Sequence, residues 1–491
     1  MFILTRLSFL LLFAFLQMSS LSLMAQSKVD SVLVRIRMDI SMPVYEGGYS
    51  PSVFVKNIVM VGNETTRYGI IMREVVFEEG DSLTLATLFD AMEESRENLL
   101  NTSLFNFVEM DLDYSEFPAI TVNMLFVERW YLWPFPILEL GDRNINEWLN
   151  DPGLRKMNYG VYLVWDNFRG RRENIKLLIK TGYRHLYTLS YTKPYFDARK
   201  TLGWGMEAGI SRSRELAYMT TGNRQQFVKL NDEFAYQSWY LNMGLNFRPA
   251  IRNTHSLRLG YNHFSFSDTL LVLNPSYSLG GASDINFLSL AWEFKHDFRD
   301  LKAYPLKGHY FDVRLTRYGL GLLPNEEMDL TTLQTSYRHF WHMAPRWYFG
   351  AGANAKISQG LTDVYFSQQG LGFNADLVRG YENYVIDGQH FMVLKSNLKY
   401  ALVPQRSGRI GFLPWEHFGL IHYAFYLNLF ADAGYVADRH FNGDNFLNNT
   451  WLTGAGIGLD FVTYYDKVFR AEFSLNRQGE AGLFFHVIAP I

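Results

Sequence analysis

Two short stretches of this sequence contain residue types that suit a buried ion pair. The first is VRGY, which consists of Val378, Arg379, Gly380 and Tyr381 and lies in a long polar segment. The second is FADAG, which contains Phe430, Asp432 and Gly434. The planar fork of an arginine matches both oxygens of a carboxylate, and a glycine lets the chain turn tightly behind it. An ordinary loop arginine that meets only solvent is the alternative.

The spacing in the second stretch indicates how such a pair would form. Successive side chains of a strand point to opposite faces, so Phe430, Asp432 and Gly434 share the face opposite Ala431. A glycine within a strand often marks a place where another backbone approaches closely. This face would therefore leave room for the backbone of a loop, and the carboxylate of Asp432 suits the guanidinium fork of Arg379.

Motifs for covalent or metal chemistry are missing from the sequence. It has no cysteine, no Gly-x-Ser-x-Gly elbow and no His-Glu-x-x-His among its 12 histidines. Gly454, Gly456 and Gly458 face one way in GAGIGLD, which favours a thin wall beside the inserted loop over a phosphate site. We expect no catalytic residue, no metal and no cofactor.

Composition narrows the class of protein. The chain has 491 residues, a net charge of -3 and a pI of about 6.5, so a nucleic-acid partner is not expected. Aromatic residues make up 16% and hydrophobic residues only 48%. An aromatic-rich, cysteine-free chain of moderate hydrophobicity is more typical of an outer-membrane barrel than of a helical membrane protein.

The N-terminus predicts export. Arg6 precedes a short apolar run at 7–16, and small Ala25 precedes Gln26, so residues 1–25 are expected to be a signal peptide. A membrane anchor is the alternative, although the run is shorter than the ~20 residues that a spanning helix needs. Residues 26–50 would be a linker or would add a strand at 32–40.

Residues 51–130 show a mixed α/β pattern. A strand at 53–63 should end at the Gly62-Asn63 turn, and Thr66 should cap a short helix running to about Glu74. Apolar residues at helical spacing predict a second helix, carried by Leu85, Leu88, Phe89, Met92 and Leu99. Two further strands are expected at 104–112 and 119–127.

An aromatic junction follows this pattern, with Trp130, Tyr131, Trp133 and Phe135 close together. Two interpretations remain open for it. The rings could form a hydrophobic mini-core under the small domain, or they could anchor the chain at the membrane interface, where aromatic residues concentrate.

From residue 136 to residue 491, alternation of apolar and polar residues dominates. Leu290 and Trp292, for example, alternate with Glu293 and Lys295. A lipid-facing apolar side and a wet lumen explain this pattern. At roughly 22 residues for each strand and its connection, this region predicts about sixteen antiparallel strands, closed into a membrane β-barrel. His422 and His486 are expected in its lumen or at its rim, with a barrel-wall phospholipase as the alternative.

These motifs together resemble the POTRA-plus-barrel superfamily of the outer membrane, the BamA/TamA-like bacterial surface antigen family, in a form with a single POTRA domain. In that superfamily an extracellular loop folds back into the lumen and its Val-Arg-Gly-Phe/Tyr arginine meets the aspartate of a Phe-x-Asp-x-Gly strand. Positions in the small domain that match the POTRA pattern are Gly62, Asn63, Thr66, Arg73, Glu74, Gly80, Leu104, Phe105 and Val108.

The resemblance implies a protein that inserts or translocates client proteins through a POTRA-guided, laterally gated barrel, with its POTRA domain in the periplasm. Implied partners are outer-membrane lipids, unfolded outer-membrane or secreted clients, and accessory periplasmic or lipoprotein subunits. A passive or gated pore with a loop plug is the alternative. The chain departs from the family pattern in showing one POTRA domain and in ending with Pro490 and Ile491 instead of an aromatic residue.

Overall fold

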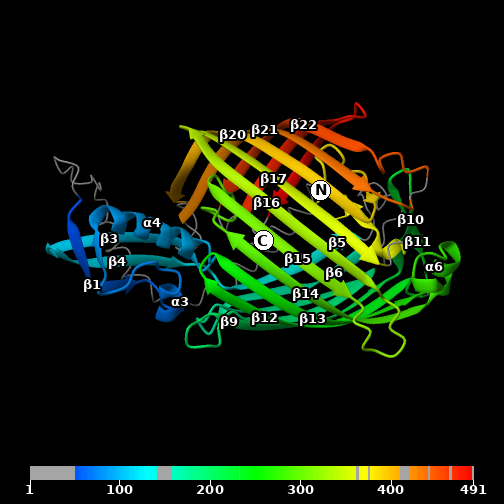
Figure 1. Cartoon of the computed structure of the whole chain (residues 1–491), viewed down its shortest axis with the longest axis horizontal. Coiled ribbons are helices and arrows are strands. Elements are labelled where there is room, and N and C mark those ends of the chain that lie inside the picture. Colours follow the sequence, from blue (N-terminus) through cyan, green and yellow to red (C-terminus); the bar gives the residue numbers. More distant parts are fainter. Residues whose placement is uncertain are drawn as a thin grey trace.

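A small α/β domain precedes a large antiparallel sheet in the computed structural model (Figure 1). The structure describes residues 50–140, 157–231, 233–360, 364–373, 376–409, 420–440, 443–463 and 467–488. The expected signal peptide and the candidate strand at 32–40 lie outside the described residues. Within the described residues, no helix is long and apolar enough to cross a membrane.

The small domain, residues 50–131, contains a four-stranded sheet of order β2-β1-β4-β3. Its elements are β1 (Ser52–Val61), α3 (Tyr68–Met72), β2 (Ser82–Thr84), α4 (Leu85–Leu100), β3 (Phe105–Glu116) and β4 (Ala119–Glu128). β1 and β4 are parallel, and the other pairs are antiparallel. The core lies between the sheet and the helices, where Val55, Leu88, Leu99, Phe105 and Val122 are fully buried.

Local sequence accounts for α4 and fails for α3. The hydroxyl of Thr84 accepts a hydrogen bond from the N–H of Thr87 and so caps α4, whose apolar side packs into the core as expected. The expected cap at Thr66 is wrong: the N-cap of α3 is Arg67, without a side-chain bond. Thr66 is buried, and its hydroxyl instead contacts Tyr131. Strand β2 was not expected.

The second unit is a sheet of sixteen antiparallel strands that follow one another in chain order. They are β5 (Leu132–Leu140), β6 (Met157–Phe168), β7 (Glu173–Gly182), β8 (Arg184–Lys193), β9 (Leu202–Ser213), β12 (Tyr236–Ala250), β13 (Asn253–Phe266), β14 (Asp284–Asp297), β15 (Gly308–Tyr318), β16 (Leu330–Ala344), β17 (Trp347–Gly360), β20 (His390–Arg409), β21 (Leu420–Ala437), β22 (Trp451–Thr463), β23 (Lys467–Asn476) and β24 (Ala481–Ile488). The expected fold class, a small α/β domain before a membrane β-barrel of sixteen antiparallel strands, is confirmed, except that no ladder closes the sheet among the described residues.

The two faces of this sheet differ in chemistry. In β12, Leu241, Met243, Leu245 and Phe247 are exposed on the outer face, where lipid would cover them. Ionisable side chains of other strands are instead buried on the inner face, among them Asp432, Asp460 and Glu472. Successive side chains of a strand point to opposite faces, so the buried polar side chains face the lumen.

The seam is the boundary between the first strand, β5, and the last, β24. Among the described residues no ladder joins these two strands, since β5 pairs with β6 and β24 with β23. The first strand begins at Leu132 instead of residue 136, as proline is tolerated in an edge strand and β5 contains Pro134 and Pro136.

The rings of the aromatic junction do not all have the same surroundings, so neither a mini-core nor a membrane anchor describes all of them. Tyr131 packs against the core of the small domain. Trp130 and Phe135 are 48% and 41% exposed, and Phe135 stacks on Trp133 with ring centroids 5.6 Å apart. One ring therefore belongs to a core, whereas Trp130 and Phe135 lie on the surface.

The small domain sits at one end of the barrel, and smaller elements gather at the other end (Figure 1). That far end carries the hairpin of β10 (Glu215–Thr221) and β11 (Arg224–Lys229), and also α6 (Asp268–Leu273). The connection from β17 to β20 leaves the far end and contains β18 (Gln369–Leu371), the VRGY residues and β19 (Ile386–Asp387).

Candidate functional site

The VRGY residues belong to a packed loop and not to a solvated one. Val378 and Tyr381 are 1% and 2% exposed, and they share an apolar cluster with Leu371, Val436 and other residues. Gly380 has φ +94°, a conformation that residues with a side chain rarely adopt. The loop is therefore held inside the barrel by apolar packing as well as by charge.

Arg379 binds Asp432 through three donors. Its Nε lies 2.7 Å from Oδ2, its Nη2 lies 2.6 Å from Oδ1, and its backbone N–H donates to Oδ2 at 3.2 Å. The two side chains are 7% and 0% exposed. The structure thus brings together the two residues that the sequence predicted to pair, in the bidentate geometry that an arginine fork allows.

The remaining donors of Arg379 also have acceptors. Nη1 donates to Asn397 Oδ1 at 2.7 Å and to Glu472 Oε1 at 3.2 Å, and Nη2 donates to the Ser396 carbonyl at 3.2 Å. The guanidinium carbon lies 3.8 Å from the ring centroid of Phe430. All five guanidinium N–H groups are therefore used, and a ring covers the guanidinium.

Glycines of the barrel wall make room for this loop. A Cβ at Gly434 would lie 2.5 Å from Val378 Cγ2, and one at Gly454 would lie 1.8 Å from the Arg379 carbonyl oxygen. A Cβ at Gly456 would instead meet the Phe430 ring at 2.6 Å. Any side chain at the first two positions would push the loop away from the wall, so the loop depends on them.

Sequence reasoning missed two partners of Arg379. Glu472 lies on β23 and Asn397 on β20, far along the chain from both motifs. Alternation already placed Glu472 on the polar face of β23, which was the available signal. It did not indicate which of the lumen residues would meet the loop.

A second set of lumen residues continues from this site toward the small domain. Tyr304, on the β14–β15 connection, donates its hydroxyl to Asp460 Oδ2 at 2.6 Å. Arg470 binds the same carboxylate through Nε at 2.7 Å and Nη2 at 3.0 Å, and its Nε lies 3.7 Å from Glu472 Oε1. Glu472 thus contacts both Arg379 and Arg470.

The same β14–β15 connection reaches the small domain directly. Asn101, which follows α4, donates to the Asp300 carbonyl at 2.7 Å and accepts from the Lys302 N–H at 2.8 Å. Polar contacts therefore run without a gap from Arg379 through Glu472, Arg470, Asp460 and Tyr304 to a connection held by α4.

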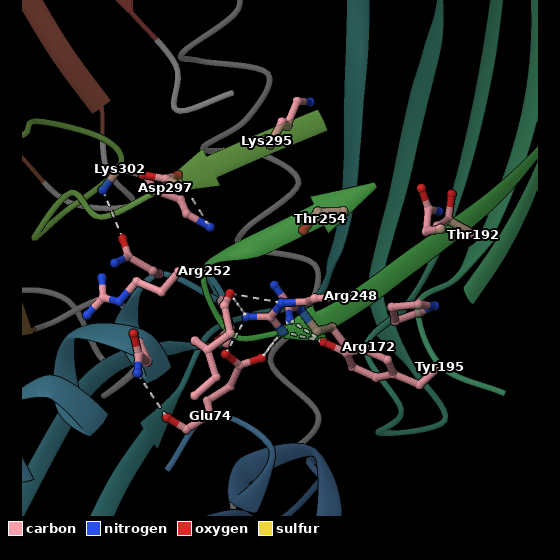
Figure 2. Close-up of a pocket in the computed structure, with 16 residues that line it drawn as sticks. Glu74, Arg172, Thr192, Tyr195, Arg248, Arg252, Thr254, Lys295, Asp297 and Lys302 are labelled. Atoms are coloured by element: carbon pink, nitrogen blue, oxygen red, sulfur yellow. Dashed lines mark hydrogen bonds and ion pairs between the residues drawn. The ribbon is translucent and has the colours of Figure 1, made fainter. Parts of the chain in front are cut away.

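The POTRA-pattern residue Glu74 lies where the small domain meets the barrel (Figure 2), and Arg73 precedes it in the chain. Glu74 is 2% exposed and pairs with Arg248 of β12 through both oxygens, with Nη2 at 2.7 Å from Oε2. Arg172 of the β6–β7 turn adds Nη1 at 3.1 Å from Oε1. Arg73 donates to the carbonyls of Lys200 and Arg248.

Electrostatics keep Glu74 ionised at this junction. Burial alone would raise the pKa of Glu74, but the hydrogen bond and charge of Arg248, with the charges of Arg172 and Arg73, hold that pKa below its usual value. The barrel partners Arg172 and Arg248 were not predicted from the sequence, because only an alternating pattern marks their strands.

The other POTRA-pattern residues support the backbone of the small domain. Gly62 has φ +90°, and a Cβ there would lie 2.1 Å from the Phe126 carbonyl oxygen. Gly80 has φ +98° in the turn before β2, and Asn63 donates to the Thr66 carbonyl at 3.2 Å. These three residues shape turns and make no contact with the VRGY loop.

The two histidines lie apart from each other. The His422 ring lies 4.1 Å from the ring of Phe107 in the small domain, and His486 Nε2 lies 3.6 Å from Glu472 Oε2. Across the described ranges, no group of three or more histidine, aspartate or glutamate side chains is arranged to hold a metal ion.

Comparison with known families identifies the barrel. Residues 167–393, which include the VRGY loop and end before Asp432, match the Omp85 superfamily domain. The chain carries an Omp85 superfamily domain. This match bears out the resemblance to the POTRA-plus-barrel superfamily for the matched part of the barrel.

Solved structures with a similar course of the chain are also known. BamA from Haemophilus ducreyi lacking POTRA domains 1-3 is 14% identical with a TM-score of 0.49, covering 89% of this chain and 84% of that one. CdiB from Escherichia coli is 13% identical with a TM-score of 0.47, covering 91% and 92%. CdiB from Acinetobacter baumannii is 12% identical with a TM-score of 0.46, covering 89% and 73%. No curated protein sequence matches the chain.

Removing Arg379 should cost more than removing Asp432. Arg379→Ala removes the bidentate partner of the buried Asp432 and leaves Glu472 with Arg470 at 3.7 Å, a loss of about 3–5 kcal/mol if the site stays dry and less if lumen water enters. Asp432→Ala still leaves Arg379 with Glu472. Thermal unfolding and client-protein levels in cells should rank the variants in this order, with the double variant less than additive.

Arg379→Lys should restore function only in part, because an ammonium group cannot reach several acceptors as a fork. Arg317→Ala is the matched control, since Arg317 pairs with Asp329 at the far end with 43% and 62% of the side chains exposed. It should change stability by less than about 1 kcal/mol. Equal effects of Arg379→Ala and Arg317→Ala would contradict a structural role for the buried pair.

Neutralising Glu74 should loosen the small domain without unfolding the barrel. Glu74→Gln leaves Arg172 and Arg248 close together without a countercharge, at a cost of about 1–3 kcal/mol. Spin labels at Glu109→Cys and Met343→Cys, in a chain that otherwise lacks cysteine, should then report a broader distance distribution. The control Glu93→Gln, whose partner Arg96 is on the same helix, should leave it narrow. Identical distance distributions for both variants would show that the ion pairs of Glu74 do not hold the small domain against the barrel.

Proposed function

We propose that this protein inserts or translocates client proteins at the outer membrane through a laterally gated barrel. The small domain would act as a POTRA domain in the periplasm and guide clients to the seam. The observation that carries this proposal is the VRGY loop, which is clamped in the lumen through the buried Arg379–Asp432 pair. This clamp, formed by Arg379 with Asp432 and Glu472, fixes the loop against the inner wall of the barrel. None of its residues lies on β5 or β24, the two strands of the seam.

The chemistry of β5 supports a seam that can open. Proline has no N–H, and in sheets it is confined to places where its nitrogen faces away from a paired strand. The pairing of β5 with β6 continues through Pro134 and Pro136 without a shift in register. The nitrogen atoms of these prolines therefore face the seam. β5 therefore offers fewer donors on its seam side, which lowers the cost of keeping β24 unpaired.

The small domain offers an edge for client capture. β3 has 12 residues and forms the edge of the sheet, paired on one side with β4. The first residues of β3 contact the barrel, where His422 Nε2 lies 3.3 Å from the Asn106 carbonyl oxygen, whereas residues 113–116 are exposed. We expect the exposed part of this edge to receive an extended segment by β-augmentation. Implied partners are unfolded outer-membrane or secreted proteins, with lipids around the barrel and accessory periplasmic or lipoprotein subunits beside it.

The proposed work requires no covalent step, so we assign no catalytic residue and no cofactor. The competing function is a passive or gated pore in which the VRGY loop is only a plug, and the burial of that loop in the lumen favours this candidate as well. The two differ in whether the seam and the small domain matter to the activity.

Depletion of the protein tests the proposal. A census of outer-membrane and secreted proteins should show specific clients falling, and re-expression of the wild-type chain, but not of Arg379→Ala, should restore them. Unchanged protein levels together with altered uptake of small solutes would support the pore instead.

The seam makes a separate prediction. Cysteines introduced at Leu138 and Phe485, both exposed and on β5 and β24, should abolish activity when crosslinked and restore it on reduction. Pro134→Val with Pro136→Val should return donors to the seam side and lower activity without a crosslink. Cysteines at Leu245 and Leu257, which are opposite each other on β12 and β13, are the control. Full activity with the seam crosslinked would refute lateral opening.

A further inference from the structure

A cavity of about 360 Å³ lies between the small domain and the inner wall of the barrel (Figure 2). Its barrel side includes Asn246, Arg248 and Lys295. Asn246 and Arg248 alternate with the exposed residues Leu245 and Phe247, so the cavity opens toward the lumen and not toward lipid. A ligand here would come from water or from a passing polypeptide.

The cavity has more positive than negative charge once existing ion pairs are set aside. Arg252 already pairs with Glu94, Lys295 with Glu293, and Asp297 is held by Arg299. Two arginines of the lining, Arg172 and Arg248, share the single carboxylate of Glu74, and Lys302 adds a third cation. Glu74 is fully engaged by the two arginines.

Lys302 is the cation with the weakest pairing. The carboxylate that pairs with it is that of Asp297, at 4.0 Å, and its side chain is 41% exposed. Asp297 is bound more closely by Arg299, through Nε and Nη2 at 2.8 Å each. Burial, together with the charges of Arg172 and Arg248, lowers the pKa of Lys302 to about 8 against the opposing charges of Asp297 and Glu74.

One further donor in the lining has no partner of its own. The Nε of Arg252 is buried and has no hydrogen-bond partner within the described part of the chain. The neutral side chains of the lining can donate or accept, and they are Asn98, Asn101, Thr102, Thr192, Tyr195 and Thr254. The surplus of cations and the unused Arg252 N–H together favour an oxyanion as ligand.

We infer that this cavity binds carboxylate groups of acidic client segments, with Lys302 as the main contact. The cavity lies at the barrel end that carries the small domain, where a segment leaving that domain would enter the lumen. That the acidic ligand is part of a client rests on the proposed function, whereas the anion site itself rests on the charges described above. Electrostatic attraction of this kind steers and orients a segment more than it holds it.

The test uses the full-length protein in detergent and two fluorescent peptides, one rich in glutamate and one with glutamine in its place. Wild-type protein should bind the glutamate peptide better, and binding should weaken as ionic strength rises. Lys302→Gln should weaken it about fivefold, as expected for the loss of one partly exposed charge contact. Lys307→Gln removes the same charge from the same connection outside the cavity lining and should have no effect.

Each contrary result has a distinct meaning. Equal binding of both peptides, or equal binding by Lys302→Gln and wild type, would overturn the inference. Inorganic phosphate that binds in a Lys302-dependent way, with no binding of the glutamate peptide, would overturn the client assignment in favour of a free anion.

The outcome is also separable from that of the proposed function. Lys302-dependent peptide binding in a protein whose depletion changes no client would leave the anion site intact and refute the function. Client loss on depletion, with peptide binding that ignores Lys302, would refute the site and keep the function.

Discussion

The position of one guanidinium group determines most of the lumen of this barrel. Arg379 satisfies all five of its donors on groups from β20, β21 and β23. An ionised group can be buried only when such partners surround it. The wall must therefore hold its carboxylates in fixed register, and glycine must occupy positions 434 and 454 so that the loop can approach. Sheet register and loop position become a single constraint.

That constraint extends to the small domain through the β14–β15 connection. Glu472 contacts both Arg379 and Arg470, and Asp460 joins Arg470 to Tyr304. The backbone of the same connection is bonded to Asn101. A movement of the small domain would therefore displace Tyr304 before it displaced the VRGY loop. The side chains on this path are the ones that would have to rearrange together.

The sequence predicted features that depend on local pattern or on short motifs. Alternation predicted about sixteen strands, helical spacing predicted α4, and the two motifs predicted the pairing of Arg379 with Asp432. Partners from distant strands were not predictable, because Glu472, Arg172 and Arg248 carry no local mark of the group they meet. The expected cap at Thr66 failed for a related reason, since its hydroxyl contacts Tyr131 across the domain. Tertiary contacts overrode a local preference there.

The strongest side-chain interactions in the described part of the lumen lie on one side of the barrel wall, away from β5. The clamp lies on β20 to β23 near the C-terminal end, where charged hydrogen bonds and apolar packing act together. The opposite side of the seam, β5, carries two prolines and therefore has fewer N–H donors to offer to β24. The clamp does not use β5 at all, so the lateral opening that we propose would leave the buried charge of Arg379 with its partners. Opening at the clamp instead would cost more, because it would strand that charge.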